Sequence, residues 1–448
     1  MKSVFLRLAT LATFATVGIV ACDKTSKVGA DPPTRPATTE TVSPMPVSVS
    51  TSNPAPVLPD VAPPPAADAQ RLAMSSNALG FDVYRKIRAT PGNLALSPAS
   101  ISAALAMTYG GARAETEAQM KRAMHLEGPR DAVMADWGTL SRSLQSPSRP
   151  VKLRIANRLF GEKTCAFDQA FLDRTRDAYG APLEPTDFKS AFEPARMRIN
   201  GWVEDQTEKR IKDLLPANAL DAATRLVLVN AIYFLADWAE PFERSETYDA
   251  KFKVAGGAAK PTPMMQSRRS YRFGQTSGVK LLELPYRGGD TSMLVALPDR
   301  EDGLDAVEAS LSPTKFAAWT AALASHEVEV KLPRFEVSPA SLSLGSELVK
   351  LGMIDAFDRQ KADFTGIANP KDPGERLSIG QVVHKAFVKV DEKGTEAAAA
   401  TAVGGVGGGL PSPPKRVFTA DHPFLFLIVE KASGLVLFMG RVADPTVR

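Results

Sequence analysis

The chain has 448 residues, of which 44% are hydrophobic, and its formal net charge at pH 7 is +4. This composition is that of a globular protein with a large core, and the small positive excess gives no case for a nucleic-acid partner. The length would accommodate two or three average domains, but no polar linker interrupts the sequence after Leu72, which favours one large folded domain.

The first 22 residues resemble a bacterial secretion signal. Lys2 and Arg7 precede an apolar run, Leu8 to Val20, that is too short to span a bilayer. The run ends in the sequence IVAC, which resembles a lipobox, so we expect lipidation of Cys22, the N-terminus of the mature protein. An ordinary signal peptide with an incidental cysteine is the alternative. The sequence thus predicts an exported lipoprotein, anchored to a membrane in the periplasm or at the cell surface.

Residues 23–70 are rich in Pro, Thr, Ser, Val and Ala and have no helical or strand period. We expect a disordered linker, which at about 3.1 Å per residue reaches roughly 150 Å when extended. It would hold the folded part, residues 71–448, away from the membrane. Cys165 is the only cysteine besides Cys22, so we expect it to be an unpaired, buried, small hydrophobic residue.

The folded part begins with helical patterns and continues with strands. In the helix that follows Asn93 to Leu96, Ser97 is the expected N-cap and Pro98 the first helical residue. The expected helices are 72–87, 98–109, 167–179, 197–215 and 341–351. The expected strands are 93–96, 151–160, 225–234, 271–273, 281–285, 293–297, 326–332, 382–390, 424–430 and 435–442. Helices that gather early and strands that gather late indicate the α+β class.

The most informative segment is VDEKGTEAAAATAVGGVGGG, residues 390–409. Composition alone also fits a helix or a flexible linker. Read as a strand, one side carries only small or β-branched residues, namely Thr395, Ala397, Ala399, Thr401 and Val403. Such a segment, without proline or bulk, is able to enter between two strands that already cover a core.

Five motifs resemble the serpin family, in the family's order and at near-family spacing over residues 72–442. They are NLALSPASISAALAMTYGGARAET (93–116), RINGWVEDQTEKRIKDLL (198–215), LVLVNAIYFLADWAEPF (226–242), EKGTEAAAA (392–400) and DHPFLFLIVEKASGLVLFMGRVADP (421–445). The resemblance implies about nine helices packed on three β-sheets, with an exposed reactive-centre loop beside the large central sheet.

The resemblance also implies a function and its residues. A serpin inhibits a serine protease covalently: the protease cleaves the loop, and the cleaved loop inserts into the central sheet and traps the acyl-enzyme. The implied hinge consists of Glu392, Gly394, Thr395, Ala397, Ala399 and Thr401. The implied shutter, a polar cluster beneath the two middle strands, consists of Ser97, Ser100, Asn230 and His384, and Trp238 falls at the breach, where insertion begins. The alternative for the four shutter residues is a set of unrelated polar groups in the core, and the alternative for Trp238 is simply a core aromatic residue.

The family's usual spacing from Glu392 places the reactive bond at Gly408-Gly409. Val406 and Leu410 are the alternatives, and all of them suit an elastase-like or subtilisin-like protease with a small or apolar primary pocket. Lys415-Arg416 would suit a trypsin-like protease but lies too far along the loop.

Enzymatic motifs are missing from the sequence. The four histidines, at 125, 326, 384 and 422, have no metal-ligand spacing, and no phosphate loop or dinucleotide fingerprint occurs. We therefore expect a monomeric inhibitor without enzymatic activity, metal or cofactor. A non-inhibitory serpin with a binding or chaperone role, an inhibitor of cysteine proteases, and a hydrolase with a dispersed Ser-His-Asp triad are the competing hypotheses.

Overall fold

The computed structural model of the chain describes residues 61–180, 183–372, 375–395 and 416–447. The α-helices in these ranges are α1 (Ala66–Ile87), α2 (Pro98–Tyr109), α3 (Ala114–Ala123), α4 (Arg130–Leu144), α5 (Gln169–Tyr179), α6 (Phe188–Gln206), α7 (Leu304–Ser310), α8 (Pro313–Ala321) and α9 (Gly345–Lys350). The strands are β1 (Leu94–Leu96), β2 (Lys152–Glu162), β3 (Glu184–Thr186), β4 (Leu226–Asp237), β5 (Tyr248–Lys253), β6 (Ala259–Thr276), β7 (Val279–Pro285), β8 (Thr291–Pro298), β9 (Ala324–Pro333), β10 (Phe335–Val337), β11 (Leu342–Ser343), β12 (Gln381–Val390), β13 (Gly394–Thr395), β14 (Val417–Thr419), β15 (Phe424–Glu430) and β16 (Leu435–Val442). The α+β class is confirmed.

The described strands form two hydrogen-bonded sheets. A seven-stranded sheet has the order β10-β12-β13-β4-β2-β3, with β11 beside β12, and a nine-stranded sheet has the order β1-β16-β15-β8-β7-β6-β9-β14, with β5 beside β6. The family resemblance implies three sheets. Two of them are joined here because the long β6 pairs with β5, β7 and β9.

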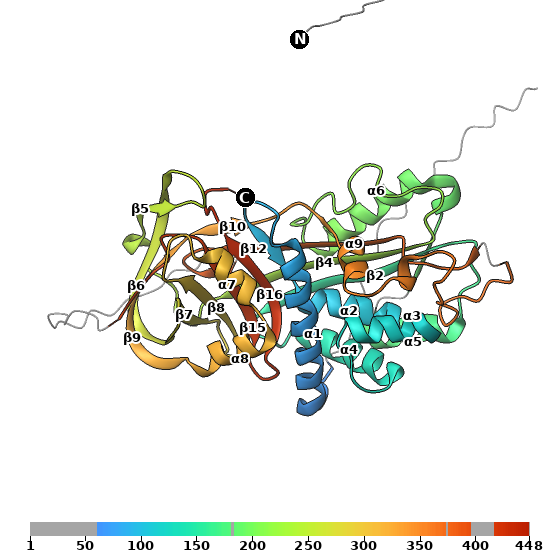
Figure 1. The fold of residues 1–448 in the computed structure, drawn as a ribbon, viewed down its shortest axis with the longest axis horizontal. Coiled ribbons are helices and arrows are strands. Elements are labelled where there is room, and N and C mark those ends of the chain that lie inside the picture. Colours follow the sequence, from blue (N-terminus) through green and yellow to red (C-terminus); the bar gives the residue numbers. More distant parts are fainter. Residues whose placement is uncertain (1–60, 181–182, 373–374, 396–415, 448) are drawn as a thin grey trace, which may run out of the picture. The chain divides into compact units, whose positions relative to one another are not determined.

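The central strand β4 is buried along nearly all of its length. It pairs antiparallel with β2 and parallel with β12, so both of its edges are used, and its continuous apolar sequence fits a strand covered on both faces. On one face, Val227 and Val229 pack against Ile199 and Val203 of α6. In Figure 1, α6 lies on one side of β2 and β4, and α2 to α5 lie on the other.

Helix α2 supports the opposite face of the sheet and is buried at every residue. The Ser97 hydroxyl accepts a hydrogen bond from the backbone N–H of Ser100 at 3.1 Å, and Pro98 is the first helical residue. The predicted cap is therefore confirmed. A helix that is apolar on all sides requires this position between α1, α4 and the sheet.

Other predicted elements differ from the structure. The amphipathic helix expected over residues 197–215 is α6, which begins at Phe188 and ends at Gln206. Helix α1 begins at Ala66, inside the expected linker, while α3 and α4 have no counterpart in the prediction. No helix among the described residues is long and apolar enough to cross a membrane.

Candidate functional site at the end of the central strands

The two central strands β4 and β12 separate at one end, and the short strand β13 lies between them. The strands pair directly from Val227 opposite Gln381 to Tyr233 opposite Phe387. Beyond this point Thr395 pairs with Ala236 on β4 and with Val390 on β12. The two residues of β13, Gly394 and Thr395, thus already occupy the position of an additional central strand.

Gly394 is required by the close approach of β13 to β4. A Cβ atom at this position would lie 2.0 Å from the carbonyl oxygen of Ala236 and 2.7 Å from Cα of Asp237. Both are backbone atoms of the neighbouring strand and are unable to rotate away. Any side chain at Gly394 would therefore push β13 out of the sheet.

Thr395 is completely buried, and its hydroxyl group lies 2.7 Å from the Tyr286 hydroxyl group. Tyr286 stacks on Trp238 with 4.6 Å between the ring centroids and 10° between the planes. Burial raises the pKa of the Tyr286 phenol, so this group stays protonated and able to form a hydrogen bond. The predicted hinge and breach residues are thus in contact through Tyr286, which sequence reasoning missed.

Trp238 also holds the turn that precedes β13. Its indole Nε1–H donates to the carbonyl of Asp391 at 3.0 Å, and its backbone N–H donates to the carbonyl of Lys393 at 2.6 Å. The turn is closed by the N–H of Asp391, which donates to the carbonyl of Gly394 at 2.9 Å. Trp238 is therefore a core aromatic and a contact of the hinge at the same time.

Glu392 anchors the other side of this turn. Its carboxylate is buried and accepts hydrogen bonds from Arg334 Nε and the Thr247 hydroxyl, both at 2.6 Å. Burial raises the pKa of the Glu392 carboxyl group, but the hydrogen bonds from Arg334 and Thr247 outweigh it and bring the pKa below its ordinary value. Glu392 is therefore charged and fixed at neutral pH.

A buried polar cluster lies farther along the same two strands, where β4 and β12 are paired directly. His384 lies opposite Asn230 in the parallel register, and its Nδ1 contacts the amide oxygen of Asn230. Its Nε2 accepts a hydrogen bond from the backbone N–H of Ser97 at 3.0 Å. Burial lowers the pKa of His384 to about 3, so the imidazole is neutral, with its proton on Nδ1.

The amide of Asn230 extends this cluster to a neighbouring strand and helix. Its Nδ2 donates to the carbonyl and the hydroxyl of Ser100, each at 2.6 Å, and contacts the amide oxygen of Asn157. Asn157 lies opposite Asn230 on β2 and donates to the Ser100 carbonyl at 3.1 Å. The structure therefore brings all four predicted shutter residues together and adds Asn157, a polar residue in an expected strand.

These contacts connect the two central strands at two places along their length. Ala236 lies six positions after Asn230, which corresponds to about 20 Å along β4. Over this distance the strands are held by β13 at one end and by side-chain hydrogen bonds of the cluster at the other. Each such hydrogen bond contributes only about 1 kcal/mol of net free energy.

Several predicted residues lie outside the described ranges. They are Ala397, Ala399 and Thr401 of the hinge, the reactive-bond candidates Val406, Gly408, Gly409 and Leu410, and the lipidation candidate Cys22. Cys165 is described, and it is a buried free cysteine as predicted.

The histidines lend no support to the hydrolase alternative. His422 contacts Asp421 and the carbonyl of Pro298, each at 2.8 Å, so both ring nitrogens have partners, and neither partner is a nucleophile. His125 pairs with Asp82, and His326 packs against Phe273. Within the described residues, no group of three or more His, Cys, Asp or Glu side chains is placed to hold a metal ion.

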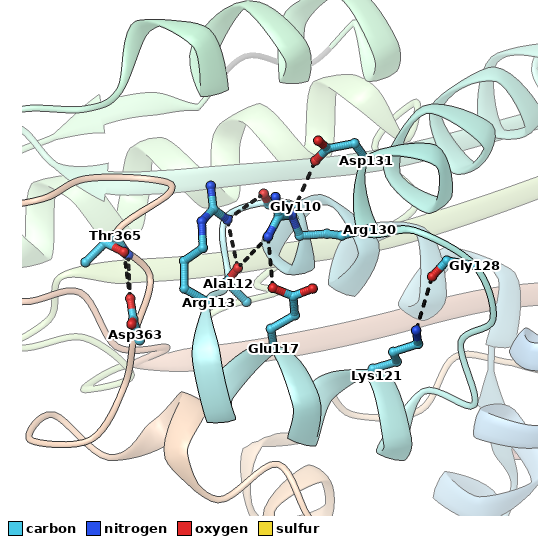
Figure 2. Close-up of polar contacts among 10 residues, drawn as sticks. All are labelled: Gly110, Ala112, Arg113, Glu117, Lys121, Gly128, Arg130, Asp131, Asp363 and Thr365. Atoms are coloured by element: carbon cyan, nitrogen blue, oxygen red, sulfur yellow. Dashed lines mark hydrogen bonds and ion pairs between the residues drawn. The ribbon is translucent and has the colours of Figure 1, made fainter.

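A separate polar cluster, shown in Figure 2, joins α2, α3 and α4. Arg130 at the start of α4 binds Glu117 at 2.9 Å and Asp131 at 3.3 Å, and it also donates to the Ala112 carbonyl. Arg113 donates to the same carbonyl at 2.8 Å. These bonds satisfy carbonyls after the end of α2.

Comparisons with known proteins agree with this geometry. A family model described as serpin (serine protease inhibitor) matches residues 74–445. Leukocyte elastase inhibitor of Homo sapiens is 39% identical over 386 residues, which cover 84% of this chain and 100% of the relative. The protein of the same name from Sus scrofa is 42% identical over the same shares, and serpin B6 of Macaca fascicularis is 40% identical, with 79% of this chain and 93% of the relative covered.

Solved structures show the same fold. Uncleaved ovalbumin superimposes with a TM-score of 0.75 at 30% identity, covering 84% of this chain and 100% of the other. Human thyroxine-binding globulin complexed with thyroxine gives a TM-score of 0.76 at 30% identity, covering 84% and 99%.

Proposed function

Because the chain belongs to the serpin family, we propose that it traps a target serine protease covalently by inserting its cleaved reactive loop between β4 and β12. The family model matches residues 74–445, and the relatives named leukocyte elastase inhibitor support serine protease inhibition. The observation that carries the mechanism is the position of β13: Gly394 and Thr395 pair with β4, and Thr395 pairs with β12 as well.

The chemistry takes place on the protease. Its serine oxygen attacks the carbonyl carbon of the reactive bond, the C–N bond breaks, and the new amino terminus leaves with a proton. The Thr395 side of the loop then carries the protease as an ester. Each residue that follows Thr395 into the sheet gains ladder hydrogen bonds to β4 and β12, which favours insertion over hydrolysis of the ester.

The target class follows from the loop sequence and the relatives. The candidates Gly408-Gly409, Val406 and Leu410 fit a small or apolar primary pocket, and several relatives are named inhibitors of leukocyte elastase. An elastase-like protease is therefore the first target to test, and a subtilisin-like protease is the second. A non-inhibitory serpin and an inhibitor of cysteine proteases remain the alternatives.

The decisive experiment is incubation with leukocyte elastase, subtilisin, trypsin and a papain-like protease. We expect a complex that survives heat and SDS with at least one serine protease. A complex with the papain-like enzyme alone would favour the cysteine-protease alternative. If every protease either leaves the loop intact or turns it over without a complex, the inhibitory function is wrong.

We also propose that the protein is exported and anchored through lipid on Cys22. The proposal rests on the N-terminal sequence, residues 1–22, and the relatives reported above are animal proteins that lend it no support. Mass spectrometry of the exported protein tests it: we expect an acylated N-terminus at Cys22 and release from membranes after Cys22→Ser. A mature N-terminus elsewhere would exclude it.

A further inference from the structure

A cluster of charged side chains lies at the end of β4 and β12 that is far from β13. Gly380, which precedes β12, donates its N–H to the carbonyl of Leu226, the first residue of β4, at 3.0 Å. Next to this bond, Lys189 of α6 and Arg225, which precedes β4, both pair with Glu375, in the segment that leads into β12, at 2.8 and 3.5 Å. We call Glu375, Lys189 and Arg225 the distal ion cluster.

Lys189 and Arg225 are held on one side of the insertion path by Glu162, the last residue of β2. The Glu162 carboxylate is fully buried and accepts hydrogen bonds from the backbone N–H groups of Phe188 at 2.8 Å and Lys189 at 3.1 Å. The backbone N–H of Glu162 donates to the Arg225 carbonyl at 2.8 Å. The start of α6, the end of β2 and the start of β4 are therefore bound together.

Glu375 belongs to the other side of the path, because its segment is fixed at the start of β12. The N–H of Ile379 donates to the Ala356 carbonyl at 2.9 Å, and Leu377 and Ile379 are both buried. The hydrogen bond from Lys189 contributes most to lowering the pKa of the Glu375 carboxyl group, so this group is charged at neutral pH. Two ion pairs thus cross from one side of the insertion path to the other.

The distal ion cluster lies where the inserted loop would end. In the register that places Thr395 opposite Ala236, each further residue that enters lies one position closer to Leu226, which is ten positions before Ala236. The reactive-bond candidate Gly408-Gly409 begins thirteen positions after Thr395, so its arrival requires the sheet to open beyond Leu226. An additional strand moves its neighbours apart by about 4.8 Å, which would separate both ion pairs beyond contact distance.

Arg225 gives this cluster a buried charge. Its side chain is only 10% exposed, and its Nε faces the Glu375 carboxylate. Parting the two sides of the path leaves this nitrogen without the anion, which raises the free energy of the opened sheet. The closed cluster therefore opposes the last step of insertion.

We propose that the distal ion cluster is a brake on the last stage of loop insertion, with Glu375 as the positioning residue that holds the start of β12 against α6 and β4. This inference rests on the proposed inhibitory function and deepens it. The cluster takes no part in the first encounter with the protease or in cleavage of the loop. It should therefore leave the association rate unchanged and determine how fast the acyl-enzyme reaches the end of the sheet.

The test uses the full chain and leukocyte elastase, with a fluorophore on the loop that reports insertion. For Glu375→Gln we expect insertion about two- to fivefold faster than for the wild type, with an equal association rate constant. Lys189→Met removes one of the two ion pairs and should give a smaller acceleration, whereas Lys189→Arg keeps the pair and should retain the wild-type rate. Added salt should accelerate insertion in the wild type more than in Glu375→Gln, because salt screens the ion pairs that the variant lacks.

The matched control is Lys163→Met. Lys163 pairs with Asp187 at 2.8 Å, the same distance as the pair of Lys189 and Glu375, but both of its members lie on the β2 and α6 side of the path. An equal acceleration by Lys163→Met and Lys189→Met, or a wild-type insertion rate in Glu375→Gln, would overturn the brake while complex formation by the wild type upholds inhibition. The absence of any wild-type complex would instead refute the proposed function, and the brake with it.

Discussion

Thr395 is the described residue that reaches farthest along the path of insertion, and it has no access to solvent. Its hydroxyl group meets the Tyr286 hydroxyl group, in a space bounded by β4 and β12. An uncharged group of this size suits the position, whereas an ion would have to be buried without a partner.

Thr395→Arg should therefore convert the inhibitor into a substrate. Burial of an unpaired guanidinium group costs several kcal/mol, so the hinge should stay out of the sheet after cleavage. We expect the stoichiometry of inhibition to rise more than about tenfold while the uncleaved fold survives. Thr395→Ser, which keeps the hydroxyl group, is the control and should still form complexes. Undiminished inhibition by Thr395→Arg would contradict the insertion geometry.

His384 makes stability depend on pH. Its pKa is lowered to about 3 in the folded protein, whereas an unfolded histidine has a pKa of about 6.5. Below pH 6.5 the unfolded chain therefore binds a proton that the folded chain excludes. The stabilisation is complete above pH 6.5 and falls by about 1.4 kcal/mol per pH unit as the pH decreases toward 3.

Urea unfolding at pH 7.0, 6.0 and 5.0 measures this effect. Between pH 6.0 and 5.0, where few carboxyl groups titrate, the free energy of unfolding of the wild type should fall by about 1 kcal/mol more than that of His384→Gln. Equal slopes for His384→Gln and the wild type would show that His384 is not the titrating group.

The segment that follows α6 crosses both central strands. Asn200 of α6 exchanges two hydrogen bonds with the backbone of Leu215, at 2.8 and 2.9 Å, which folds the segment back over the sheet. Lys212 lies in this segment, and its carbonyl accepts a hydrogen bond from the Lys385 ammonium of β12 at 3.0 Å. Helix α6 itself packs on β2 and β4, so this bond ties the two sides of the insertion path together.

Lys385→Met should loosen this tie and accelerate insertion. One hydrogen bond contributes about 1 kcal/mol, which corresponds to about a fivefold change in rate. The rate of insertion is measured with a fluorophore on the loop after addition of elastase. Lys212→Met is the control, because it alters the side chain but keeps the carbonyl that Lys385 binds. A rate equal to that of the wild type would mean that the crossing segment does not restrain β12.

Local sequence signals explain which elements could be predicted well and which could not. The hairpin of β15 and β16 was predicted at its observed bounds because its apolar runs are separated by a turn that ends at Gly434, which has a φ of 75°. Helix α6 was placed too late. Ile211 and Leu214 are buried and continue the apolar pattern, but Glu208 and Lys209 have φ values of 50° and 62°, which end the helix.

The start of α6 was missed for a similar local reason. Pro194 lies within it, and Ala191 has a non-helical φ of −144°. Proline disfavours the interior of a helix, so the sequence before Met197 carries a signal against the helix that the structure forms there. In the candidate site, the shutter followed from the family resemblance, but Asn157 and Tyr286 depend on cross-strand register and packing, which no short-range pattern reveals.

In the uncleaved molecule, only the short strand β13 lies between the central strands β4 and β12. Strands β4 and β12 bond to each other over seven residue pairs, and beyond them β13 contributes only two residues. Insertion of the loop would replace this direct pairing with a full strand that bonds to both neighbours. The folded protein should therefore be more stable after cleavage than before it.

The cleaved protein should melt at a temperature at least about 10 °C higher than the intact one. About ten inserted residues, each contributing roughly 1 kcal/mol in net hydrogen bonding and burial, account for a shift of this size. Differential scanning calorimetry before and after limited cleavage measures it, and mass spectrometry identifies the fragment that begins at Gly407, Gly409 or Pro411. Thr395→Arg, cleaved at the same bond, is the control and should show no rise, because its hinge stays outside. An unchanged unfolding midpoint for the cleaved wild type would mean that the loop does not enter the sheet. A cut after Lys415 or Arg416 with inhibition intact would mean that the reactive bond lies there and not at Gly408-Gly409.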